Sequence, residues 1–115
     1  MRILTGLIAV LMLVAGCNRD LDAKASDKDE PKNVLVVTGN DYPGHKWKLT
    51  TPVLTTALRA DKRMAVTVTE EPNDLAALDL SDYDTLVLHF MDWETPDPGP
   101  TARTNLKNFV RSGGG

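Results

Sequence analysis

Three short runs of β-branched and aliphatic residues recur along the chain, each followed by residues that favour turns. The runs are Val34–Thr38, Ala65–Thr69 and Thr85–Phe90, and each has the length and composition of a strand. Gly39 ends the first run, and Glu70–Asn73 forms a turn after the second. We therefore predict three strands, of which the first is buried on both faces.

Helical spacing of apolar residues appears between and after these runs. Thr51 and Pro52 predict a capping hydroxyl before the first turn of a helix of about ten residues, with Val53, Leu54, Ala57 and Leu58 on its apolar face. Thr101–Ser112 predicts a second helix, which Gly113 ends as its C-cap. A short helical or irregular connection is expected over 74–80. Strands that alternate with helices are typical of a parallel α/β sheet with right-handed crossovers.

The amino-terminal residues follow a different pattern. A positive start is followed by an apolar run, Ile3–Gly16, and the chain then becomes polar. This is the pattern of a secretory leader. As a helix the run would measure about 21 Å, which is short of the roughly 30 Å needed to span the hydrocarbon layer. We predict that residues 1–16 are a signal peptide.

The leader ends in Leu13-Val14-Ala15-Gly16-Cys17, which resembles the lipobox of bacterial lipoproteins. The resemblance implies cleavage before Cys17 and lipid attachment to it, which would anchor the chain to a membrane of the bacterial cell envelope. An ordinary leader that happens to contain a free cysteine is the alternative. Residues 17–32 then form the lipidated cysteine and a charged, flexible linker, and which membrane holds the anchor is left open.

The composition and length of the chain exclude some classes of structure and function. The chain has 115 residues, a net charge of −3 and a single cysteine, which excludes an internal disulfide and argues against a nucleic-acid surface. Residues 33–115 provide for one small domain. The last predicted helix leads into Gly113–Gly115 with no strand after it. We therefore expect a truncated sheet that belongs to a longer protein.

Ligands of open parallel sheets bind beyond the carboxyl ends of the strands, and candidate chemistry gathers there. The residues are Asp41, His45 and Trp47 after the first strand, and Asp92, Trp93 and Glu94 after the third. His45 is the candidate acid or base, and the tryptophans could stack on sugar rings. The alternatives are a histidine bonded to the backbone, core or lid tryptophans, and solvated acids. His89 is expected to be a satisfied core histidine.

The sequence lacks the motifs of several kinds of functional site. No H-x-x-x-H pair supports a metal site, so no metal is predicted. Gly39–Gly44 has neither the spacing of a dinucleotide fingerprint nor the G-K-[ST] ending of a P-loop. No G-x-S-x-G elbow supplies a nucleophile. No cofactor is therefore predicted.

The order of motifs over residues 33–115 resembles the first half of the ThuA-like (trehalose-utilisation) family. The motifs are VLVVTG, His45-Lys46-Trp47, YDTLVL, Asp92-Trp93-Glu94 and a helix that ends in RSGGG. The resemblance implies a flavodoxin-like sheet similar to class I glutamine amidotransferases, and a link to trehalose and related sugars. It also implies that His45 is a site residue and that Asp92, Trp93 and Glu94 line the pocket.

The leading hypothesis is a lipid-anchored protein that acts on a carbohydrate or sugar derivative in the cell envelope. Its partners would be the bilayer, through acylated Cys17, and a carbohydrate-like small molecule. One alternative is a non-catalytic module that binds a sugar or a partner. Another is an inactive truncated fragment.

Overall fold

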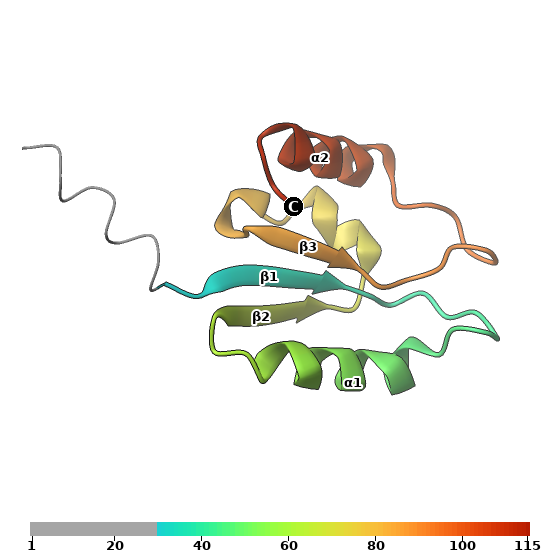
Figure 1. Cartoon of the computed structure of the whole chain (residues 1–115). Coiled ribbons are helices and arrows are strands. Elements are labelled where there is room, and N and C mark those ends of the chain that lie inside the picture. Colours follow the sequence, from blue (N-terminus) through green and yellow to red (C-terminus); the bar gives the residue numbers. More distant parts are fainter. Residues whose placement is uncertain (1–29) are drawn as a thin grey trace, which may run out of the picture.

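The computed structural model describes residues 30–115, so the predicted leader and the lipid attachment at Cys17 lie outside the described residues. Three strands form one parallel sheet: β1 (Lys32–Val37), β2 (Met64–Thr69) and β3 (Thr85–Leu88). The order is β2-β1-β3, with β1 paired to both neighbours (Figure 1). The predicted parallel α/β sheet is confirmed.

Helices cover both faces of this sheet. Helix α1 (Trp47–Arg59) lies on one face, and α2 (Pro100–Arg111) lies on the other (Figure 1). Two 3₁₀ helices, η2 (Pro72–Ala76) and η3 (Leu80–Asp82), accompany α2 and correspond to the expected irregular connection. Within residues 30–115, no helix is both long enough and apolar enough to cross a membrane.

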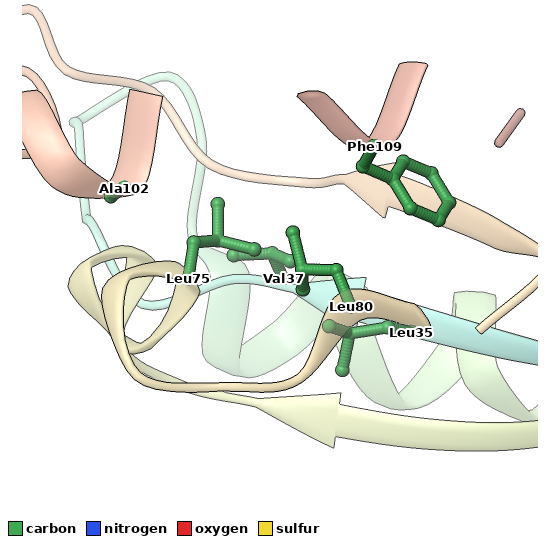
Figure 2. Close-up of a cluster of buried hydrophobic side chains, with 6 residues drawn as sticks. All are labelled: Leu35, Val37, Leu75, Leu80, Ala102 and Phe109. Carbon is green, nitrogen blue, oxygen red and sulfur yellow. The ribbon is translucent and has the colours of Figure 1, made fainter. Parts of the chain in front are cut away.

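The central strand supplies the core because both of its faces are covered. Successive side chains of a strand point to opposite faces, so Leu35 and Val37 face α2 while Val34 and Val36 face α1. All four are buried. Figure 2 shows the cluster on the α2 face, made of Leu35, Val37, Leu75, Leu80, Ala102 and Phe109. Burying each large apolar side chain contributes roughly 1.5–3 kcal/mol, which makes this cluster the main stabilising element.

Helix α1 begins five residues earlier than the sequence predicted. Its first residue is Trp47, and its N-cap is Lys46, whose side chain forms no capping hydrogen bond. The carboxylate of Asp41 in the preceding loop instead accepts the Trp47 backbone N–H at 3.2 Å. The prediction of Thr51 as the cap was therefore wrong. Thr51 lies inside the helix, where its buried hydroxyl meets that of Thr38 at 3.1 Å.

The third strand is shorter than predicted. It ends at Leu88, and the backbone N–H of His89 donates a last hydrogen bond to Val37 at 2.8 Å. The side chain of His89 is half-buried at the start of the following loop. The expectation of a core histidine inside a strand is therefore not met, because β3 ends at Leu88 and His89 lies where the chain leaves the sheet.

Helix α2 ends at a glycine turn, as the sequence predicted. Gly113 has a φ of 100°, and its N–H donates to Val110, while the N–H of Gly114 donates to Phe109. This pair of bonds is a Schellman motif, which favours glycine at the positive-φ position. The backbone of Gly115 then pairs alongside β3, donating to Asp84 at 3.1 Å and accepting from Leu86 at 2.8 Å.

Candidate functional site

Two loops meet beyond the carboxyl ends of the strands. The loop that leaves β1 (39–46) and the loop that leaves β3 (89–99) extend in the same direction (Figure 1). They are neighbours because β1 and β3 are adjacent in the sheet. Side-chain contacts join these loops to each other and to the first turn of α1. We call the residues that make these contacts the rim cluster: Asn40, Tyr42, His45, Thr50, His89, Asp92 and Trp93.

A pair of histidines lies at the centre of the rim cluster. The rings of His45 and His89 pack edge to face with their centroids 4.6 Å apart. Nδ1 of His45 is buried without a hydrogen-bond partner among residues 30–115. Such a nitrogen costs about 1–3 kcal/mol unless a ligand or water satisfies it, and a catalytic role is one of the explanations for such a group.

A tight turn places His45 in this position. Tyr42 and His45 exchange backbone hydrogen bonds of 3.3 and 2.7 Å around Pro43 and Gly44. A Cβ atom at Gly44 would approach the Tyr42 ring to 2.9 Å, so a glycine lets the ring lie over the turn. The turn therefore carries the aromatic ring and the imidazole of the site together.

The environment of His89 favours its neutral form. Partial burial lowers the pKa of this imidazole, and the neighbouring His45 lowers it further. Nε2 of His89 lies 2.9 Å from the hydroxyl of Thr50 in the first turn of α1. A neutral imidazole has one nitrogen that accepts hydrogen bonds and one that donates them, so it suits proton transfer near neutral pH.

An aromatic pair borders the histidines. The Tyr42 and Trp93 rings lie 4.8 Å apart at a tilt of 59°, and this contact connects the two loops. Trp93 nevertheless keeps 74% of its surface exposed. A large exposed apolar ring that is held in place by a neighbour provides a surface on which another flat, partly apolar group can stack.

The acidic candidates differ in how their oxygens are used. Asp41 caps α1 through Trp47. Asp92 accepts from the amide of Asn40 and, at 3.4 Å, from the hydroxyl of Thr95, so it holds the two loops together. Glu94 is exposed. Two of the three carboxylates therefore have a structural task in addition to any contact with a ligand.

Trp47 is placed differently from Trp93. Its side chain is buried, and the ammonium of Lys48 lies 5.4 Å from its ring centroid. A hollow of about 210 Å³ lies here, lined by Trp47, Lys48, Thr51, Pro52 and Glu70. The structure therefore brings His45, Asp92 and Trp93 into one cluster, while Trp47 lines a separate hollow beside the end of β2.

Sequence reasoning missed four members of the rim cluster: Asn40, Tyr42, Thr50 and His89. The Tyr-Pro-Gly-His turn was a usable signal for Tyr42, because such a turn brings its flanking residues together. Nothing in the local pattern indicated that Thr50 would reach a residue that is 39 positions away. In the part of the chain that the structure describes, no group of three or more His, Cys, Asp or Glu residues could hold a metal ion.

Comparison with known proteins finds a solved structure with a similar fold. The chain is a small α/β unit with a parallel sheet and flanking helices, and this arrangement recurs in a solved structure. That structure is of a protein from Parabacteroides merdae ATCC 43184 described as ThuA-like, with a TM-score of 0.58 and 26% identity. The chain therefore has a ThuA-like fold.

The match covers 75% of this chain and 31% of the neighbour, so the chain spans about a third of that protein's length. A scan against protein-family models finds no match. A search of curated proteins finds none either.

Proposed function

We propose that the rim cluster binds a carbohydrate-like small molecule and that the protein acts on a sugar or sugar derivative, with His45 as the proton-transfer residue. The observation that carries this proposal is the meeting of the two loops, which sets an imidazole pair beside an exposed indole. Aromatic faces stack on the apolar C–H faces of sugar rings, and imidazoles exchange protons with hydroxyl groups. The chain has a ThuA-like fold, and the sequence resemblance to the ThuA-like family implies a link to trehalose and related sugars.

The test uses calorimetry and product analysis on the full chain. Disaccharides and their keto derivatives are titrated into the wild type, His45→Ala, Trp93→Ala and, as a control, Val110→Ala, which alters an exposed apolar residue on α2. We expect Trp93→Ala to weaken binding about fivefold, because stacking contributes on the order of 1 kcal/mol, and Val110→Ala to leave binding unchanged. Unchanged turnover in His45→Ala would remove the proton-transfer role.

A non-catalytic binding module is the second candidate, and the carboxylates favour it. Asp41 and Asp92 both accept hydrogen bonds from within the chain, so neither is wholly available to act as acid or base. Saturable sugar binding with no product over several hours would select this alternative. Binding that is lost in Trp93→Ala but kept in His45→Ala would support it further.

We propose in addition that Cys17 carries lipid and holds the protein to a membrane of the bacterial cell envelope. The support is the apolar leader that ends in Val14-Ala15-Gly16-Cys17. Mass spectrometry of the mature protein is expected to show a start at Cys17 with acyl chains attached. A Cys17→Ser variant should lose this modification and its membrane attachment. An unmodified thiol on a wild-type protein recovered from the aqueous fraction would refute the anchor.

A further inference from the structure

Thr50 occupies an unusual place between a helix and the rim cluster. It lies in the first turn of α1, and its hydroxyl has two partners. One is the carbonyl oxygen of Lys46, at 3.3 Å, and the other is Nε2 of His89, at 2.9 Å. Thr50 is therefore the residue through which α1 contacts the histidine at the end of β3.

The two contacts together favour a proton on one particular nitrogen of His89. A hydroxyl has one proton to donate, whereas a carbonyl oxygen can only accept. If the Thr50 hydroxyl donates to Lys46, its oxygen must accept from Nε2–H of His89. Only this assignment makes both contacts hydrogen bonds, because the reverse would place the lone pairs of Thr50 against those of the Lys46 carbonyl.

We propose that Thr50 is a positioning residue that holds His89 as the Nε2–H tautomer and thereby leaves Nδ1 of His89 as a hydrogen-bond acceptor for a ligand hydroxyl. The proposal rests on the proposed function for the chemistry of the ligand. The argument for the tautomer uses the two contacts of Thr50 and does not depend on the ligand.

The remaining contacts of His89 agree with this role. Among residues 30–115 its ring has the hydrogen bond to Thr50 and the edge contact with His45, and no hydrogen bond to its Nδ1 is found there. The lowered pKa of His89 keeps the imidazole neutral, so an acceptor nitrogen is retained at neutral pH. A hydroxyl-rich molecule is the kind of ligand that donates to such an acceptor.

The first test reads the tautomer directly and needs no ligand. The chain contains only two histidines, so ¹⁵N-histidine labelling of the full chain gives two sets of ring signals, and a His45→Gln variant assigns them. Long-range ¹H–¹⁵N correlation spectra distinguish a protonated ring nitrogen from an unprotonated one. We expect a protonated Nε2 and an unprotonated Nδ1 for His89. A protonated Nδ1 would overturn the proposal.

Variants of Thr50 test the cause of the tautomer. Thr50→Val removes the hydroxyl and should give mixed tautomers, while Thr50→Ser retains the hydroxyl and should preserve the wild-type pattern. Thr56→Val is the control, because Thr56 is an exposed threonine of the same helix. A wild-type spectrum in Thr50→Val would show that Thr50 does not hold the ring.

The second test adds the sugars used above. We expect Thr50→Val to bind sugar about tenfold more weakly than the wild type, because it disturbs one hydrogen bond between His89 and the ligand. Thr50→Ser should bind within about twofold of the wild type, because it retains the hydroxyl. Sugar binding that is unchanged in Thr50→Val would refute the ligand contact while leaving the proposed function intact. If the wild type binds no sugar but shows the expected tautomer, the proposed function fails and the role of Thr50 in holding the ring stands.

Discussion

Gly39 shows how a single residue sets the spacing of the site. Its φ is 132°, and a Cβ atom there would lie 2.0 Å from the carbonyl oxygen of Glu70. The end of β1 can therefore pass the end of β2 only if residue 39 has no side chain. This close approach fixes where the loop that carries His45 begins.

We expect Gly39→Ala to lower the free energy of unfolding by about 2 kcal/mol or more, because backbone strain adds to a clash with main-chain atoms. Urea unfolding followed by circular dichroism measures the change. Gly99→Ala is the matched control, since a Cβ there meets only Asn73 Oδ1 at 3.5 Å, and its loss should be smaller. Equal losses in the two variants would contradict the assigned role of Gly39.

The histidine pair makes a second prediction at the residue scale. The proximity of His45 contributes to the lowered pKa of His89, after burial as the larger cause. His45→Gln removes the neighbouring charge and retains a polar side chain. The pKa of His89 should therefore rise toward its ordinary value of about 6.5 without fully reaching it. An NMR titration of His89 measures this, and a pKa that stays the same or falls in His45→Gln would contradict the coupling.

At the scale of elements, a pair of buried hydroxyls joins β1 to α1. Thr38 and Thr51 are both buried, and their hydroxyl oxygens lie 3.1 Å apart. Thr51 cannot serve as a helix cap in this position. Its hydroxyl instead satisfies that of Thr38, which follows the last residue of β1.

A double-mutant cycle tests this contact. Thr51→Val should cost about 1–2 kcal/mol, because it leaves the buried hydroxyl of Thr38 without its partner. Adding Thr38→Val removes the unsatisfied group, so the double variant should be less destabilised than the sum of the single variants by about 1 kcal/mol. Denaturant unfolding of the four proteins gives the coupling energy, and strict additivity would show that the hydroxyls do not interact.

The same elements show what the sequence could and could not predict. The strands and α2 were found because their signals are local, namely β-branched runs and a helix that ends at Gly113. The start of α1 was missed because its cap is the carboxylate of Asp41, six positions before the residue it caps. A threonine before a proline is typical of a helix start, and here burial against β1 takes precedence over that local pattern.

The candidate site was also predicted in part: the sequence indicated some of its residues but not their partners. Ligands of parallel sheets bind beyond the carboxyl ends of the strands, and this rule led to His45, Asp92 and Trp93. The partners of these residues come from tertiary contacts, such as Tyr42 against Trp93 and Asn40 against Asp92. Contacts over about 50 positions leave no periodic trace in a sequence, which is why these partners were not predicted.

For the molecule as a whole, the order β2-β1-β3 determines which loops form the site. The loops after β1 and β3 meet because these strands are paired, and the histidines come together there. The loop after β2 lies on the other side of β1, where Glu70 lines the hollow beside Trp47. The arrangement of strands therefore separates the rim cluster, with its two histidines, from the hollow beside Trp47.

The partial burial of His89 links the rim cluster to the stability of the molecule. The pKa of His89 is lower in the folded chain than the value of about 6.5 expected when the chain is unfolded. Between these two values the unfolded chain binds more protons than the folded chain does. This contribution to the free energy of unfolding is therefore present above about pH 6.5, is lost as the pH falls through this interval, and levels off below the lowered pKa.

Urea unfolding at a series of pH values from about 7.5 to 5 measures this loss, and His89→Gln should remove the part that is due to His89. Asp79 and Asp84 also have pKa values that hydrogen bonds lower from the ordinary value of an aspartate, about 3.9, so their effect lies outside the interval. His89→Gln should therefore lose the change in the free energy of unfolding that the wild type shows between about pH 6.5 and the lowered pKa of His89. If the wild type and His89→Gln have parallel stability curves between about pH 7.5 and 5, burial of His89 does not contribute to the pH dependence of folding.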